Sequence, residues 1–306
     1  MDVVDVCNGE ENIQIHFENF VDSEPFPSIK YTPFNVTGPG CQHDPCEVLY
    51  SGCQCHQTLC DKGCPCITRS LGLSYDSNGC LLSGCHSGNK PVLECNSSCM
   101  CSQACQNRVV QNGINFRLEV FRSDKKGWGL KALENIPKDR FVCEYAGEII
   151  GFEEANKRAL NMSVEDSNYI LILKEHLKDG KTLRTCVDPA NIGNIGRFIN
   201  HSCDPNLYMT AVRVDNEVPK LALFAKREIF WGEELSFDYA GDPNEGVTDQ
   251  ENSFVNSPHC QYEGGKSLKS VRIFDKPCFC NASNCRGFLP FDEDLYSELA
   301  EFENQS

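Results

Sequence analysis

The sequence predicts a mostly β fold with short helices, flanked by two cysteine-rich segments. Between residues 115 and 241, runs of β-branched and aromatic residues alternate with polar turns, which is typical of many short strands. Before and after this region, cysteines recur at short spacings that suit metal ligands. We expect metal to hold the flanking segments together, because they could not form a core by themselves.

Composition excludes several classes of protein. A chain of 306 residues can bury one sizeable core or two modest ones. The net charge of -16 argues against strong autonomous nucleic-acid binding and favours a basic partner. The apolar runs are too short to span a bilayer, and the acidic start lacks the features of a signal peptide. We therefore expect a soluble, intracellular protein that does not associate with membranes.

The chain has 21 cysteines, an odd number, and in a reducing compartment they favour thiolate metal sites over disulfides. Nine of them form two groups in which Cys-x-Cys pairs recur, and residues two apart in an extended segment project to the same side. These nine are Cys53, Cys55, Cys60, Cys64, Cys66, Cys95, Cys99, Cys101 and Cys105.

The number of these cysteines predicts how they share metal. Zinc takes four ligands, so nine thiolates are too many for two isolated sites and too few for three. Three zinc ions use all nine if three sulfur atoms each bridge two metals, and we favour this cluster. The alternatives are two mononuclear sites with a spare thiol, or buried cysteines without metal. Cys80 and Cys85 do not continue the pattern, and we do not expect them to be ligands.

A second cysteine signature lies near the end of the chain, in "KPCFCNASNCRGF". It supplies Cys278, Cys280 and Cys285, so one zinc ion there needs a fourth ligand. Cys203 is the candidate, because the polar turn "NHSCDPN" could reach a distant loop. The carboxyl-terminal segment would then fold back over Asn200 and His201.

The residue patterns between the cysteine segments predict strands, turns and one helix. Strands are expected over the runs "FRLEVFRS", "RFVCEYAGEII", "NYILILKE", "RTCVDPA" and "KLALFAKREI". The stretches "KKGWG", "KDG" and "VDNEVP" separate them as turns. One short amphipathic helix is expected over "FEEANKRAL", residues 152–160.

Six stretches, taken in order, carry a family resemblance: "CSQACQNRVVQNG", "KKGWGL", "EYAGEII", "GRFINHSCDPN", "EELSFDYAG" and "CFCNASNC". The chain resembles SET-domain protein lysine methyltransferases with pre-SET and post-SET zinc segments, which implies a SET-domain fold of small sheets. The expected divisions are an N-terminal segment 1–50, a pre-SET zinc-cluster domain 51–114, a SET catalytic domain 115–241, a polar loop 242–273, a post-SET zinc segment 274–290 and an acidic C-terminal tail 291–306.

The resemblance also implies a function. It implies transfer of methyl groups from S-adenosylmethionine to the fourth, ninth or thirty-sixth residue of the histone H3 tail, up to dimethyl or trimethyl lysine. The expected partner is the histone tail in nucleosomes, and the expected location is the nucleus and chromosome. Some relatives carry a transposase domain, but this sequence ends soon after the post-SET cysteines, so we expect none here.

Three aromatic residues match the lysine channel of the family: Tyr239 as the catalytic tyrosine, Tyr145 to position the nitrogen, and Phe237. A lysine amine is protonated at neutral pH, with a pKa of about 10.4, and a narrow apolar channel would favour its neutral, nucleophilic form. Ordinary core packing in strands is the alternative role for these aromatic residues.

The cofactor positions follow from the same resemblance. They are Lys126, Gly127, Trp128, Gly129, Tyr169, Arg197, Asn200 and His201. Glycine lets a turn pass close to a ligand, although a tight hairpin would explain "GWG" equally well. Ser202 beside His201 does not predict a hydrolase, because adjacent side chains rarely reach the geometry of a triad.

Two other classes of protein share some of these sequence features. A catalytically silent chromatin-binding module would also contain zinc, but the presence of Tyr145, Tyr239 and the Asn200–His201 pair speaks against silence. A metal-storage or redox protein would explain the cysteines but not the long strand-rich segment.

Overall fold

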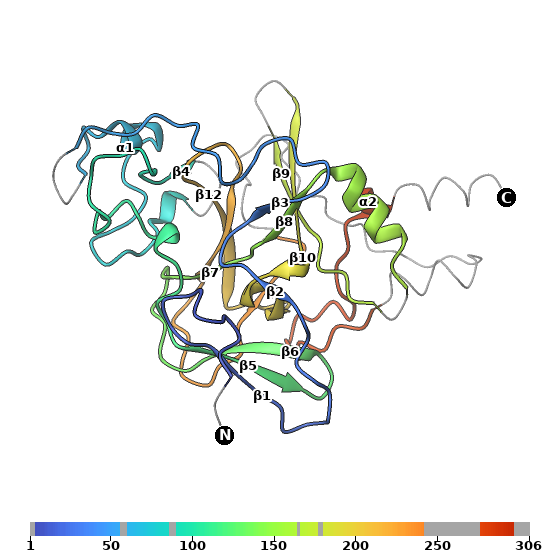
Figure 1. Cartoon of the computed structure of the whole chain (residues 1–306). Helices are drawn as coiled ribbons and strands as arrows, with labels where there is room; N and C mark the ends of the chain where they lie inside the picture. The colour runs from blue at the N-terminus through green and yellow to red at the C-terminus, as the bar shows by residue number, and fades with distance from the viewer. Residues whose placement is uncertain are drawn as a thin grey trace.

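The structure, a computed structural model, describes residues 4–55, 60–85, 90–163, 166–176, 180–241 and 276–296. Within these residues the strands form four small sheets. In Figure 1 the cysteine-rich segment around α1 lies at one end of the molecule, α2 lies at the other, and the sheets lie between them.

Two sheets incorporate strands from the N-terminal segment. The three-stranded sheet has the order β1-β5-β6, and β1 runs parallel to β5. The five-stranded sheet has the order β2-β10-β8-β3, with β9 paired to β10 off this path. The bounds are β1 (His16–Glu18), β2 (Lys30–Tyr31), β3 (Val36–Thr37), β5 (Leu118–Ser123), β6 (Gly127–Ala132), β8 (Gly147–Ile150), β9 (Leu171–His176) and β10 (Thr182–Gly193).

The other two sheets connect the pre-SET segment and the candidate site to the same core. The order in the four-stranded sheet is β4-β12-β13-β7, and β11 pairs with β14 in parallel. The bounds are β4 (Val92–Leu93), β7 (Phe141–Glu144), β11 (Asn200–His201), β12 (Leu207–Arg213), β13 (Lys220–Ala225) and β14 (Ser236–Phe237).

The helices are short. α1 (Pro65–Arg69) has proline in its first turn, where no backbone N–H is needed. α2 (Phe152–Leu160) buries Ala155 and Ala159, while acidic residues in its first turn and basic residues in its last match the helix dipole. The 3₁₀ helices are η1 (Ser83–Cys85), η2 (Val110–Asn112), η3 (Ile195–Phe198) and η4 (Glu293–Tyr296).

The largest core cluster joins the N-terminal segment to the sheets. Ile15 from the N-terminal segment is fully buried in it, together with Leu130 of β6, Val187 of β10 and Leu221 of β13. Because burial of apolar surface is the main favourable term in folding, the N-terminal segment folds as one unit with the strand-rich region.

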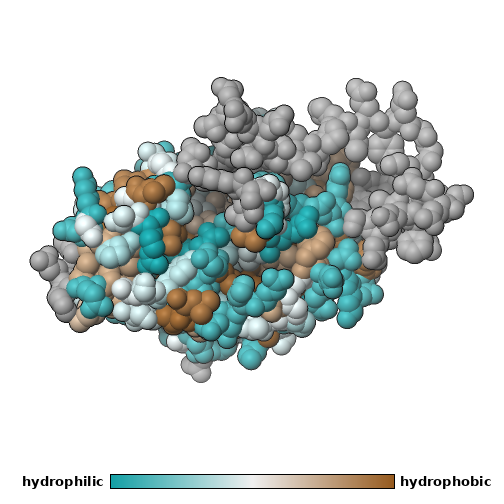
Figure 2. All heavy atoms as spheres, turned by 90° about the horizontal axis from the view of Figure 1, so that it is seen from above, coloured by the Kyte–Doolittle hydropathy of each residue, from teal (hydrophilic) through white to brown (hydrophobic). Residues whose placement is uncertain are grey.

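Outside this core, hydrophobic surface is dispersed. Exposed large side chains such as Phe20, Leu71 and Trp231 come from distant parts of the chain. Figure 2 shows small hydrophobic groups among hydrophilic residues on one face. In the part of the chain that the structure describes, every helix is too short or too polar to cross a membrane.

The prediction of a mostly β fold is confirmed, and so is the helix over residues 152–160. Strands occur in each of the five predicted runs. The prediction that "KKGWG" is a turn is wrong in part, because β6 begins at Gly127, whose φ of 73° lies where glycine is favoured. The polar segment 242–267 and the tail from 297 onward lie outside the described residues.

Candidate functional site

Three aromatic side chains form the centre of the candidate site. Phe237 ends β14, Tyr239 follows two residues later, and Tyr145 follows β7. The ring of Phe237 lies 4.8 Å from that of Tyr239 and 5.9 Å from that of Tyr145, measured between centroids. Tyr145 and Phe237 are buried, whereas Tyr239 is 39% exposed, so the aromatic group opens to the surface at Tyr239.

Both tyrosine hydroxyl groups are held by backbone oxygen atoms. The Tyr145 hydroxyl donates to the carbonyl of Tyr169 at 2.6 Å, and the Tyr239 hydroxyl donates to that of Ile199 at 2.9 Å. Burial raises the pKa of each phenol above its usual value. Both groups therefore stay neutral near pH 7 and act there as hydrogen-bond donors rather than as bases.

The pairing of β11 with β14 places Asn200 and His201 beside the aromatic residues. His201 lies opposite Phe237 in the register, and its ring is 5.3 Å from that of Tyr239. The backbone N–H of Tyr239 donates to Nδ1 of His201 at 3.2 Å. Burial lowers the pKa of His201 to about 4, so the ring is neutral near pH 7 and can accept this bond.

Asn200 connects the aromatic site to β6. Its Nδ2 donates to the carbonyl of Trp128 at 3.2 Å and to Oε1 of Glu234 at 3.0 Å. Glu234 also forms an ion pair with Lys126. A Cβ atom at Gly129 would lie 2.8 Å from the Phe121 ring and 3.2 Å from the Asn200 amide, so a side chain there would shift both groups.

Arg197 and Tyr169 form another part of the site. The Arg197 guanidinium stacks 4.3 Å above the centroid of the Tyr169 ring, and its Nε donates to the carbonyl of Pro189 at 3.1 Å. Its Nη1 is buried and has no hydrogen-bond partner among the described residues. Buried donors normally have a partner, so this nitrogen is suited to a polar group of a bound ligand.

The sequence analysis missed several neighbours of these residues. Phe26 lies 5.3 Å from Trp128 and 5.4 Å from Phe198, measured between ring centroids, and Phe17 packs on Trp128 as well. Nothing in the local sequence indicated that the N-terminal segment packs on the site. Glu234 could have been found, because it lies within "EELSFDYAG", three residues before Phe237.

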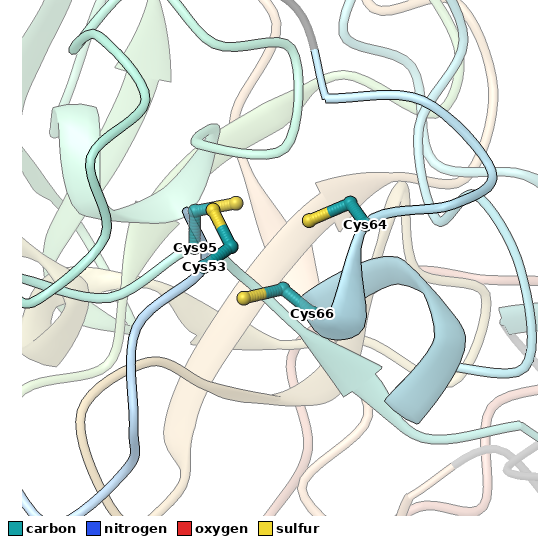
Figure 3. Close-up of side chains that lie close together, drawn as sticks. All are labelled: Cys53, Cys64, Cys66 and Cys95. Atoms are coloured by element: carbon teal, nitrogen blue, oxygen red, sulfur yellow. The ribbon is translucent and has the colours of Figure 1, made fainter. Parts of the chain in front are cut away.

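The nine pre-SET cysteines, here called the pre-SET cluster, form one compact group. Seven of their sulfur atoms fall into three overlapping sets of four, each within 4.8 Å, and Cys53 belongs to all three sets. Figure 3 shows the sulfur atoms of Cys53, Cys64, Cys66 and Cys95 converging on a common space. The overlap means that neighbouring metal ions would share sulfur atoms.

The remaining members contact the same group. The Cys99 sulfur lies 3.6 Å from that of Cys66, and Cys105 is buried in the cluster. Nitrogen donors surround the sulfur atoms, including the guanidinium groups of Arg69 near Cys66 at 3.5 Å and of Arg108 near Cys101 at 3.6 Å. Such donors favour thiolates, the form that binds metal.

Four cysteines near the aromatic residues, here called the post-SET site, form a second group. The sulfur atoms of Cys203, Cys278, Cys280 and Cys285 lie within 4.8 Å of one another. The backbone N–H of Arg286 donates to the Cys203 sulfur at 3.4 Å, and the Arg286 guanidinium pairs with Asp238. Because Asp238 lies between Phe237 and Tyr239, the carboxyl-terminal segment contacts the aromatic site directly.

Comparison with known proteins gives consistent matches along the chain. The family model for the Pre-SET motif matches residues 7–108, and that for the SET domain matches residues 127–240. The histone-lysine N-methyltransferase SETMAR of Bos taurus is 45% identical over 297 residues, covering 96% of this chain and 91% of the bovine protein. The histone-lysine N-methyltransferase EHMT1 of Homo sapiens is 40% identical over 242 residues, covering 77% of this chain and 18% of EHMT1.

Solved structures agree. The methyltransferase domain of human SETMAR matches with a TM-score of 0.79 and 44% identity, over 95% of this chain and 99% of that domain. The segments "YTPFNVTGPG" and "IGNIGRFINHSC" also resemble SETMAR. Arabidopsis thaliana SUVH6 in complex with SAM matches with a TM-score of 0.71 and 28% identity, over 94% of this chain and 55% of the SUVH6 chain. KRYPTONITE in complex with mCHH DNA, an H3(1-15) peptide and SAH matches with a TM-score of 0.67 and 28% identity. The match covers 94% of this chain and 53% of the KRYPTONITE chain.

Proposed function

Because this chain belongs to the SET-domain family of histone-lysine N-methyltransferases, we propose that it methylates the tail of histone H3 with S-adenosylmethionine as donor. The target is the lysine at the fourth, ninth or thirty-sixth residue of the tail, and the product extends to dimethyl or trimethyl lysine. The observation that carries the proposal is the packing of Tyr145, Phe237 and Tyr239 against the β11–β14 pair.

The aromatic group suits a lysine side chain. A narrow apolar opening binds the methylene groups and disfavours the ammonium form, so the amine sheds its proton to solvent before it reacts. The phenols of Tyr145 and Tyr239 keep their protons, and their oxygen atoms can accept a hydrogen bond from the neutral amine. These residues orient the nucleophile and exclude water, which is the main requirement of an in-line transfer.

The cofactor site is proposed to lie next to the aromatic group, which contacts His201 and Tyr169. Lys126, Trp128, Asn200 and Arg197 supply charge, a flat ring and polar groups, and the buried Nη1 of Arg197 offers a donor without a partner in the described structure. Gly127, Gly129, Tyr169 and His201 complete the proposed set. When bound, S-adenosylmethionine supplies an activated methyl group. The SAM and SAH complexes of SUVH6 and KRYPTONITE support this assignment.

The cysteine groups are proposed to bind four zinc ions. Three belong to the pre-SET cluster, whose overlapping sets of sulfur atoms suit shared ligands, and one belongs to the post-SET site. All ligands are thiolates, and zinc readily takes four of these in a tetrahedron. The role of the metal is structural, because every position around each ion is taken by sulfur.

The proposed partner is the histone H3 tail in nucleosomes, in the nucleus and on the chromosome. The net charge of -16 complements a basic peptide. The H3(1-15) peptide in the KRYPTONITE complex supports a histone tail as the substrate.

The decisive experiment is mass spectrometry of H3 peptides and recombinant nucleosomes after incubation with enzyme and S-adenosylmethionine. We expect a mass increase of one to three methyl groups at a single lysine, and a large loss of product with Tyr239→Phe. Peptide binding without any methylated product would instead indicate a binding module. Methylation of all three candidate lysines at similar rates would contradict a specific site.

A further inference from the structure

The last described residues of the chain dock onto α2, at the opposite end of the molecule from α1 and the pre-SET cluster. Residues 291–296, here called the C-terminal clasp, follow the post-SET site and include η4. Leu295 and Tyr296 are buried in a separate core cluster, against Ala155 and Ala159 of α2. Figure 1 shows this red segment beside α2.

Polar contacts fix the clasp at several points. Asn156 of α2 donates to the carbonyl of Leu295 at 2.8 Å. The Lys174 ammonium lies 3.0 Å from Asp292 and 2.9 Å from Asp294, so β9 is held to the clasp as well. The buried side chains and these polar contacts together fix the clasp in one position against α2 and β9.

One contact leads to the proposed cofactor site. The Nδ2 of Asn168 donates to the Tyr296 hydroxyl at 3.0 Å, and the Oδ1 of the same side chain accepts the backbone N–H of Ile170 at 2.9 Å. The bond between the Asn168 side chain and the Ile170 backbone closes a turn around Tyr169, which lies between these two residues. Tyr169 in turn stacks under Arg197 and accepts the Tyr145 hydroxyl bond.

The start of the post-SET segment is tied to the same region. The Lys276 ammonium donates to the carbonyl of Asp166, three residues before Tyr169. The segment from 276 to 296 is thus attached to the chain around Tyr169 at both of its ends, and to Cys203 between them.

We propose that the C-terminal clasp is a positioning element of the cofactor site, in which Tyr296 holds Asn168 and Asn168 holds Tyr169. The inference rests on the proposed role of Tyr169 in binding S-adenosylmethionine. Tyr296 is linked to Tyr169 through the Asn168 side chain, so it acts as a positioning residue. Binding, rather than the chemical step, is the property it controls.

The test is Tyr296→Phe, which keeps the buried ring and removes only the hydroxyl. We expect the KM for S-adenosylmethionine to rise about two- to tenfold, as for the loss of one hydrogen bond, with kcat and the zinc count unchanged. Hydrogen exchange in the cofactor-free protein should become faster at the Ile170 amide. Tyr208→Phe is the matched control, because Tyr208 is also buried but packs in a different core cluster.

A second variant, Asn168→Ala, checks the proposed order of action. Residues that act through one another are not additive, so Asn168→Ala with Tyr296→Phe should be no worse than Asn168→Ala alone. Additive effects, or an unchanged KM and unchanged Ile170 exchange in Tyr296→Phe, would overturn the proposal. A wild-type protein that binds no S-adenosylmethionine would instead refute the proposed function, while the exchange at Ile170 would still report on the clasp.

Discussion

The two cysteine groups are built from the same ligand chemistry but connected to the fold in different ways. The pre-SET cluster takes all nine of its sulfur atoms from one stretch of the chain, and Cys53, Cys66 and Cys95 are fully buried. The post-SET site takes three half-buried cysteines from the carboxyl-terminal segment and the fourth, Cys203, from the turn after β11.

This difference separates a structural role from a role in organising the active site. The pre-SET cluster holds together one end of its segment. The rest of that segment joins the catalytic region through β4 alongside β12 and through a shared core that includes Tyr75 and Phe224. The post-SET site joins two distant parts of the chain directly beside His201 and Asp238. Loss of metal from the pre-SET cluster should therefore unfold its segment, whereas loss of metal from the post-SET site should disorganise the reaction site.

The largest effect is expected from Cys53→Ser, because Cys53 belongs to every set of sulfur atoms in the pre-SET cluster. Structural zinc contributes about 10–16 kcal/mol to the folding of small zinc domains, so the cluster and its segment should fail to form. Native mass spectrometry should show a loss of three zinc ions out of four. Cys85→Ser is the control, since Cys85 is buried outside the cluster and should retain all four.

Cys285→Ser should have the next largest effect. We expect the loss of one zinc ion and most of the activity, on the order of 100-fold, because misplacement of a reaction site by about 1 Å costs that much. The other three zinc ions should remain. A matched change at the half-buried Cys80 should alter neither measurement. A variant that lacked its zinc yet methylated normally would show that the post-SET site does not organise the reaction.

Chelator should distinguish the two groups in the wild-type protein. Because three of its ligands are only half buried, the post-SET site should release zinc first, and activity should fall while the pre-SET cluster stays intact. Added zinc should restore that activity. A time course of zinc count against activity tests this order, and simultaneous loss of all metal would remove the distinction between the two regions.

The smallest change concerns Phe237, which supplies no metal ligand, so its substitution should leave both zinc groups untouched. Phe237→Tyr introduces a hydroxyl that can hold the amine or an ordered water, which leaves less room for further methyl groups. One hydrogen bond is worth about 0.5 to 1.5 kcal/mol, enough for a change of up to about tenfold in a rate. We expect more monomethyl product without loss of turnover, measured by mass over time on one peptide.

If the unmodified enzyme stops at monomethyl lysine under excess cofactor, Phe237 does not control how many methyl groups are added. An unchanged product distribution in Phe237→Tyr would lead to the same conclusion, and only the packing role of the ring would remain.

Much of the molecule is already determined by its sequence. Metal ligands must be particular residue types, so the spacing of twelve cysteines, nine and three, predicts two metal groups before any fold is known. Cys203 was added as the fourth ligand of the second group because it lies in a polar turn. The strands within the five predicted runs are also readable from their β-branched and aromatic residues, and α2 is readable from its helical period. β6 was predicted as a turn, and β12 was not predicted. The motif stretches placed Asn200, His201 and Tyr239 among the candidates.

Only the tertiary structure decided how these parts meet. β1, β2 and β3 contain two or three residues each, too few to show a period, and they are formed by pairing with strands far along the chain. The packing of Phe26 on Trp128 and of Tyr296 on Asn168 joins residues about one hundred or more positions apart. Such contacts leave no local pattern, because they depend on burial that exists only once the core has assembled.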